Sequence, residues 1–175
     1  ASAAVIAIVL ETIRAVPSAP SAPRLLVATP SGERHAVGAA LSAAAASIDG
    51  WSIVHLGADV PNADIAAAAA TTAARALALS IVYVEDREAI VAEVRGLRDK
   101  LDAAVPLLIG GAGVAGIARD VRAPGGPVAE GMVELRGHRA RERRDRRPTG
   151  PPARRAVAVH RPTQFDSVRR GVTRR

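Results

Sequence analysis

The stretch "RLLVATPSGERHAVGAA", residues 24–40, joins a short apolar run to an alanine-rich segment through one charged cluster. The apolar run at 24–29 is bounded by prolines, which predicts a buried strand. From Ala36 to Ile48 the apolar residues have helical spacing, so the stretch predicts a strand, a loop and a helix. In an open α/β sheet such a loop lies outside the carboxyl ends of the strands, where these folds bind ligands.

The same order of elements recurs along the chain. Further strands are predicted at 51–57, 77–84, 105–113 and 128–129, and helices after Pro61 with Asn62 as the cap, over 85–104, near 114–121 and near 131–135. Strands that alternate with helices of this length predict a parallel sheet with helices on both faces. The expected class is α/β: a doubly wound, flavodoxin-like (Rossmann-like) sheet of four to five strands in the order 2-1-3-4-5.

The two ends of the chain differ from this unit in composition. Residues 1–16 predict one amphipathic helix, and the Pro/Ser/Ala-rich segment after it is typical of a linker. The net charge of +7 comes from the other end: residues 1–135 hold 10 Lys and Arg against 14 acids, whereas 136–175 hold 14 Arg against three acids. Such dense like charge predicts a disordered tail. We therefore expect a helix and linker at 1–23, one folded domain at 24–135 and a basic tail at 136–175.

Composition also narrows the function classes. The sequence has no cysteine, which excludes disulfides, thiolate metal sites and a cysteine nucleophile. The first apolar run, residues 3–13, contains Glu11 and falls far short of the roughly 20 residues of a membrane span. We expect a soluble, cytoplasmic protein with no membrane partner. The arginine-rich tail is either a solvated end or an arm that binds nucleic acid weakly, because Phe165 is the one aromatic residue among its arginines that could stack on a base.

The predicted first, third and fourth strands end in residues that suit a binding site. Glu33 lies two residues before His35, and a carboxylate that takes the proton of one ring nitrogen makes the other nitrogen a better metal donor. One histidine and one acid are too few for a protein-only zinc site, which has three or four ligands. A metal that brings its other ligands in a macrocycle needs only this one, although His35 as an ordinary surface histidine stays open.

Three short motifs resemble those of a known family. The hexapeptide ERHAVG at 33–38 resembles the Asp-x-His-x-x-Gly motif of the cobalamin-binding domains of methionine synthase, corrinoid mutases, corrinoid methyltransferase subunits and cobalamin-dependent photoreceptor regulators. The tripeptide SIV at 80–82 resembles the family's Ser-x-Leu, and GG at 110–111 its Gly-Gly. Here 41 residues separate the first two motifs and 27 the second and third, which is similar to the family's spacing. The resemblance covers residues 24–135.

This resemblance implies a cofactor and a role for each motif. His35 would be the lower axial ligand of cobalt in place of the cofactor's nucleotide base, and Glu33 would hydrogen-bond His35. The displaced nucleotide tail would enter a slot where Gly38 allows close approach, Ser80 bonds the base and Gly110-Gly111 leave room. The implied binding residues are Glu33, Arg34, His35, Gly38, Ser80, Val82, Gly110 and Gly111, with His35 on the metal and adenosylcobalamin or methylcobalamin as the cofactor.

Departures from the family pattern favour one branch. Glu33 replaces the commoner aspartate, and GERH and LGADVP resemble the photoreceptor regulators more than the enzymes, while Val82 and Val84 replace a leucine and a threonine. The resemblance therefore implies a sensor or regulatory domain rather than an enzyme, in which light breaks the bond between cobalt and an upper alkyl group. A corrinoid carrier subunit of a methyltransferase or mutase, and a degenerate domain without ligand, remain alternatives.

The family also suggests partners. Its regulators carry a helical bundle that covers the upper cobalt face, and residues 1–16 supply at most one helix of it. The chain is then a fragment, or the face is open or covered by a partner, either a second copy or a bundle. A DNA-binding module would lie in a domain that these 175 residues lack.

Three further features of the sequence suggest a site only weakly. His55 in the second strand is expected to pack rather than to bind a metal. Asp59 either faces the crevice or caps the next helix. The glycine-rich stretch GGAGVAG at 110–116 does not indicate a dinucleotide site, because it follows the fourth strand rather than the first.

Overall fold

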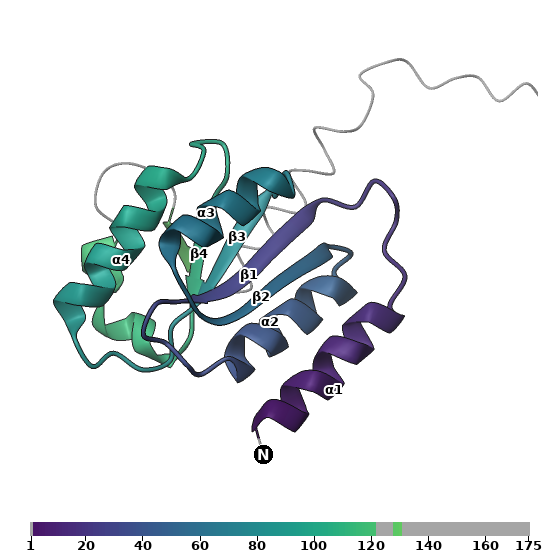
Figure 1. Cartoon of the computed structure of the whole chain (residues 1–175), viewed down its shortest axis with the longest axis horizontal. Coiled ribbons are helices and arrows are strands. Elements are labelled where there is room, and N and C mark those ends of the chain that lie inside the picture. Colours follow the sequence, from purple (N-terminus) through teal and green to yellow (C-terminus); the bar gives the residue numbers. More distant parts are fainter. Residues whose placement is uncertain (1, 122–127, 131–175) are drawn as a thin grey trace, which may run out of the picture.

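The computed structural model describes residues 2–121 and 128–130 (Figure 1). Its helices are α1 (Ser2–Ala15), α2 (Val37–Ile48), α3 (Asn62–Thr71), α4 (Arg87–Lys100), the 3-10 helix η1 (Ala112–Gly116) and α5 (Ala118–Val121). Its strands are β1 (Arg24–Pro30), β2 (Ser52–Val60), β3 (Ala76–Ser80), β4 (Leu107–Gly110) and β5 (Val128–Glu130). They form one parallel sheet in the order β2-β1-β3-β4-β5, so the expected doubly wound, flavodoxin-like class is confirmed.

Strand β1 lies inside the sheet and is buried on both faces. It pairs with β2 on one side and β3 on the other, and every residue after Arg24 is buried. Alternate side chains of a strand point to opposite faces. Leu25 and Val27 therefore join the core on the α2 side, while Leu26 and Ala28 join the core on the α3 and α4 side. This two-sided burial explains why the strand is a continuous apolar run without polar alternation.

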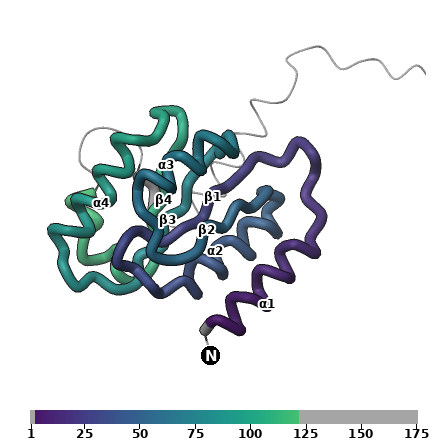
Figure 2. Tube along the Cα trace, in the orientation of Figure 1, coloured from purple at the N-terminus to yellow at the C-terminus, as the bar shows by residue number. Residues whose placement is uncertain are grey.

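Helices cover the two faces of the sheet unequally. Figure 2 shows α1 and α2 on one side and α3 and α4 on the other. The α2 face is built from small residues, and Ala39, Ala43 and Ala46 pack there around the buried Trp51. The opposite face is richer in leucine, isoleucine and valine, among them Ile65 on α3 and the buried face of α4. Alanines allow α2 to lie close to the sheet.

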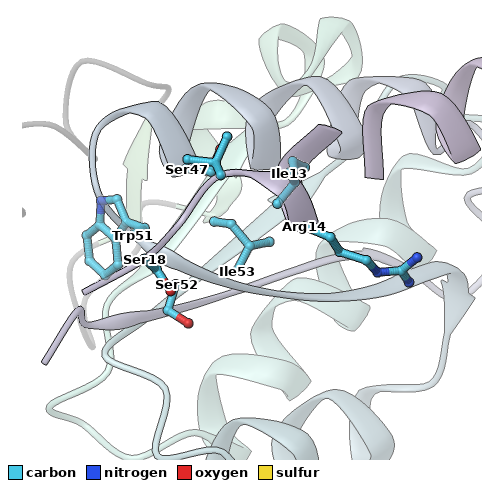
Figure 3. A pocket seen from close by; sticks show the side chains of 8 residues that line it. Ile13, Arg14, Ser18, Ser47, Trp51, Ser52 and Ile53 are labelled. Carbon is cyan, nitrogen blue, oxygen red and sulfur yellow. The ribbon is translucent and has the colours of Figure 1, made fainter. Parts of the chain in front are cut away.

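Helix α1 packs against α2 rather than directly on the sheet (Figure 1). Its Ile13 contacts the α2-side core, but Val5 and Ile8 on the same helix are exposed. A cavity of about 160 Å³ lies where α1 ends (Figure 3), lined by Ile13, Arg14, Val16, Ser18, Ser47, Trp51, Ser52 and Ile53. None of the helices in residues 2–121 is long and apolar enough to cross a membrane.

Several boundaries differ from the sequence prediction. Strand β3 ends at Ser80 instead of 84: the Ile81 N–H still bonds to the Gly110 carbonyl, but the Val82 and Tyr83 N–H groups bond to the Glu33 side chain rather than to a neighbouring strand. Strand β2 continues to Val60, with two register shifts against β1. The prediction of Asn62 as the α3 cap is wrong: Pro61 is the cap, and Asn62 donates its side-chain N–H to the Glu93 carbonyl at 2.8 Å.

The predicted fifth strand is confirmed as β5, and the helix predicted near 114–121 is divided between η1 and α5. Helix α4 begins and ends with the charges expected for its dipole, and Asp86 caps it through bonds from the Glu88 and Ala89 N–H groups. The helical stretch predicted near 131–135 and the predicted tail at 136–175 lie outside the described residues.

A core truncation tests the two-sided burial of β1. Leu26→Ala removes a side chain with no exposed area, and we expect it to lower the free energy of unfolding by about 2–5 kcal/mol. The matched variant Ile48→Ala removes a side chain that is 79% exposed and should change it by less than about 0.5 kcal/mol. Urea titrations followed by circular dichroism measure both, and equal effects would contradict the described core.

Candidate functional site

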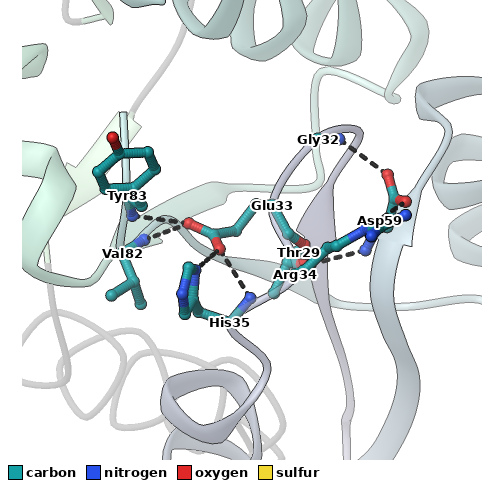
Figure 4. A network of polar contacts seen from close by, with 8 residues as sticks. All are labelled: Thr29, Gly32, Glu33, Arg34, His35, Asp59, Val82 and Tyr83. Atoms are coloured by element: carbon teal, nitrogen blue, oxygen red, sulfur yellow. Dashed lines mark hydrogen bonds and ion pairs between the residues drawn. The ribbon is translucent and has the colours of Figure 1, made fainter. Parts of the chain in front are cut away.

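The Glu33 carboxylate links the loop after β1 to the loop after β3 (Figure 4). One oxygen, Oε1, accepts from the His35 backbone N–H at 2.7 Å and contacts His35 Nδ1 at 2.6 Å. The other, Oε2, accepts from the backbone N–H groups of Val82 at 2.7 Å and Tyr83 at 2.8 Å. The Glu33 side chain is 1% exposed, so this carboxylate is a buried connection between two loops that are about fifty residues apart in the sequence.

Burial and hydrogen bonding act on Glu33 in opposite directions. Removal from water is the largest single effect and by itself raises the pKa of a carboxyl group. The bonds from the N–H groups of Tyr83, His35 and Val82, together with the His35 ring, outweigh it, so the pKa of Glu33 is lowered. Glu33 is therefore ionised at neutral pH although it is buried.

The geometry determines which nitrogen of His35 is available. An ionised carboxylate can only accept hydrogen bonds, so Nδ1 must be the donor toward Glu33. In the neutral ring Nε2 then carries the lone pair. The His35 side chain is 62% exposed, and Nε2 takes part in no hydrogen bond within the described part of the chain. His35 thus has one ring nitrogen held by Glu33 and one that is free to accept a bond from outside the protein.

No group of three or more acidic, histidine or cysteine side chains could hold a metal ion within residues 2–121 and 128–130. A metal at His35 would need its other ligands from elsewhere. The donor set fits a metal whose equatorial positions are already filled by a macrocycle.

A second acid fixes the other side of the same loop. Asp59, near the end of β2, accepts from the Gly32 N–H at 2.8 Å and forms an ion pair with Arg34 at 3.7 Å. Its own backbone N–H lies 2.9 Å from the Thr29 hydroxyl, which in turn donates to the Glu33 carbonyl. Asp59 therefore stabilises the loop after β1. The interpretation of Asp59 as a cap of α3 is wrong, because Pro61 takes the cap position.

Gly38 and Ser80 lie against each other where α2 begins and β3 ends. A Cβ atom at position 38 would lie 3.0 Å from Ser80 Oγ and 3.7 Å from a methyl of Val82. A side chain at position 38 would fill the space between helix and strand. Ser80 itself is buried, and its hydroxyl is one of few buried polar side-chain groups among the described residues.

The two glycines at the end of β4, Gly110 and Gly111, have different surroundings. Gly111 has φ +110°, and a Cβ there would lie 2.2 Å from the carbonyl oxygen of Ile81. The protein's own backbone therefore requires glycine at 111. A Cβ at Gly110 would meet nothing within 4 Å, so Gly110 borders open space at this end of the sheet.

The structure thus places the sequence-predicted residues at one end of the sheet. The loops after β1 and β3 meet through Glu33, and the Ile81 backbone bonds to Gly110 at the end of β4 and to Gly113 in η1. Arg34 is 83% exposed and pairs with Asp59 rather than with the other motif residues.

The comparison of sequences assigns a family to this arrangement. The sequence matches the family described as the B12 binding domain over residues 23–136. The chain belongs to the B12-binding domain family. The HTH-type transcriptional repressor CarA of Myxococcus xanthus is 32% identical to it over 123 residues, which are 69% of this chain and 42% of the repressor. The chain therefore spans less than half the length of this curated relative.

Solved structures resemble the B12-binding domain in fold. They include a cobalamin-binding protein of Desulfitobacterium hafniense DCB-2 (TM-score 0.55, 22% identity, 70% of this chain and 59% of that one). The methanol:cobalamin methyltransferase complex MtaBC of Methanosarcina barkeri gives 0.55 at 18% identity over 71% of this chain and 48% of that one. The monomethylamine corrinoid protein of Methanosarcina barkeri gives 0.53 at 19%, over 79% and 63%. At these identities the likeness shows the fold alone.

Sequence reasoning did not identify all residues that build this end of the B12-binding domain. Thr29 was missed, although it is the first polar residue at the end of an apolar strand, and so was the exposed Tyr83 beside His35. His55 lies in mid-strand opposite Val27, half-buried, and burial lowers its pKa. The described residues offer its Nε2 no hydrogen-bond partner. This placement agrees with a packing role.

The two glycines at the end of β4 make a matched pair for a stability test. Gly111→Ala forces a Cβ against the Ile81 carbonyl and a left-handed φ on alanine, so we expect a loss of at least about 1 kcal/mol in the free energy of unfolding. Gly110→Ala meets open space and should cost less than about 0.5 kcal/mol. Equal losses in thermal or urea unfolding would contradict the described loop.

Replacement of the buried acid has a pH-dependent effect. The pKa of Glu33 is lower in the folded protein than its ordinary value of 4.5, so its stabilisation is complete above that value and is lost as pH falls through the folded-state pKa. We expect Glu33→Gln to cost about 1–3 kcal/mol at neutral pH, with a difference from wild type that shrinks in acid. Urea titrations across this range measure it.

The control for this test is Glu11→Gln, which removes an exposed carboxylate from α1 and should change stability at neutral pH by less than about 0.5 kcal/mol. A Glu33→Gln protein that is as stable as wild type at neutral pH would show that the carboxylate does not hold the two loops together.

Proposed function

We propose that this domain binds cobalamin with His35 as the lower axial ligand of cobalt and serves as the sensing domain of a regulator. The observation that supports the ligand role is the pair Glu33–His35: a buried, ionised carboxylate holds Nδ1 at 2.6 Å while Nε2 faces outward. Bound cobalamin would supply a cobalt ion with a light-sensitive bond to an upper alkyl group, as in adenosylcobalamin or methylcobalamin.

The residues around His35 fit a corrinoid. Glu33 orients the imidazole, as carboxylates do for other metal-binding histidines. Gly38 leaves the space between α2 and Ser80 without a side chain, and Gly110 borders open space, so both suit a nucleotide tail beside the sheet. Ser80 offers a hydroxyl to the base of that tail, and a methyl group of Val82 lies beside Gly38.

The regulatory role is supported by the curated relative. CarA, a transcriptional repressor, is 32% identical, whereas the corrinoid proteins of known structure are 22% identical or less. The described chain supplies a ligand-binding domain, so a role in gene control would need a DNA-binding module and partners outside it. We infer that the upper cobalt face is covered by a helical partner or a second copy.

The proposed ligand role can be tested by colour retention. Purified protein mixed with methylcobalamin in the dark should stay red through desalting, and His35→Ala should lower the affinity at least about tenfold and change the visible spectrum. His55→Leu, which removes a histidine from mid-strand, is the matched control and should bind like wild type. Loss of colour from the wild-type protein would refute cobalamin binding.

Illumination distinguishes a sensor domain from a carrier subunit. If the domain is a sensor, illumination of the adenosylcobalamin complex should change its size on a sizing column, while the free protein stays unchanged. A complex that keeps its cofactor and its size in light would instead favour a carrier subunit.

A further inference from the structure

Tyr83 is an exposed aromatic residue next to the His35 ring. The two ring centroids lie 6.3 Å apart with an angle of 59° between the planes. Tyr83 is 63% exposed, whereas Trp51, the other aromatic residue in the described chain, is buried. The protein therefore holds one of its three aromatic residues outward at the site rather than in a core built from aliphatic side chains.

The position of Tyr83 is fixed by the same carboxylate that orients His35. The Tyr83 backbone N–H bonds to Glu33 Oε2 at 2.8 Å, and His35 Nδ1 lies 2.6 Å from Oε1 (Figure 4). One buried group therefore holds the His35 ring and the Tyr83 backbone next to each other before any ligand binds. On the α4 side Tyr83 borders a cavity of about 190 Å³, lined by Ser31, Gly32, Glu33, Tyr83, Val84, Glu85, Asp86, Ala89, Ile90 and Glu93. The ring thus has room to adjust.

We propose that Tyr83 is a positioning and binding residue of this site: its ring packs against a bound corrin beside His35 and restricts the orientation of the imidazole. This inference rests on the proposed function. A corrin is a broad, flat macrocycle with much apolar surface, and an aromatic side chain offers a large contact area with few rotatable bonds. Contact with the corrin would bury a side chain that is now mostly in water.

Substitutions at Tyr83 isolate the side chain, because its bond to Glu33 comes from the backbone and is kept in every variant. Methylcobalamin titrations in the dark should show Tyr83→Ala binding about tenfold more weakly than wild type, with an altered visible spectrum. Tyr83→Phe should stay within about twofold, because the ring rather than the hydroxyl makes the contact. Ile48→Ala, an exposed truncation elsewhere, is the control and should bind like wild type.

A second readout needs no cofactor. In the free protein the NMR shifts of the His35 ring protons should move in Tyr83→Ala, which removes the neighbouring ring current, and stay near wild type in Tyr83→Phe and Ile48→Ala. Unchanged shifts would refute the positioning role. The binding results separate this inference from the proposed function. If wild type binds methylcobalamin and His35→Ala does not, but Tyr83→Ala binds like wild type with the same spectrum, the Tyr83 contact is refuted and the proposed function stands. If wild type does not bind, the proposed function and this inference both fail.

Discussion

The architecture of this site depends on one buried carboxylate. Burial removes water from Glu33, which disfavours its charged form. Hydrogen bonds from three backbone N–H groups and the His35 ring stabilise the charge in place of water. Because two of these N–H groups belong to the loop after β3, the charge of Glu33 ties two loops into one surface. Burial also makes the arrangement specific, since an unpaired charge at this depth would cost far more than an exposed one. His35 and Tyr83 take their places around this group.

The sheet order explains why so few residues suffice. In the order β2-β1-β3-β4-β5 the carboxyl ends of β1, β3 and β4 are adjacent, so short loops after these strands meet without long connections. Glycines at 38, 110 and 111 lie at this end of the sheet in different surroundings: Gly38 lies against the Ser80 side chain and Gly111 against the Ile81 backbone. Gly111 is required by the fold itself, whereas Gly110 borders open space. A glycine in a binding motif can therefore serve folding, a ligand, or both.

The sequence predicted most of this fold because its signals are local. Apolar runs that alternate with helical segments predicted the strands, and the helix predicted over 85–104 is observed as α4. The errors arise where a residue distant in the sequence determines the end of a strand or the cap of a helix. Strand β3 ends early because Glu33 binds the N–H groups of Val82 and Tyr83, and Asn62 turns toward Glu93 instead of capping its helix. Tyr83 gave no periodic signal, since only the folded chain brings it beside His35.

The most direct measurement of the central claim is electron paramagnetic resonance of the cobalamin complex with cobalt reduced to Co(II). A single axial ¹⁴N ligand splits each cobalt line into three, and a ¹⁵N ligand splits it into two. If His35 binds cobalt through the nitrogen that Glu33 leaves free, protein made with ¹⁵N-histidine should show pairs where unlabelled protein shows triplets. Triplets that persist in the labelled protein would show that the cofactor keeps its own base, and the account would be wrong.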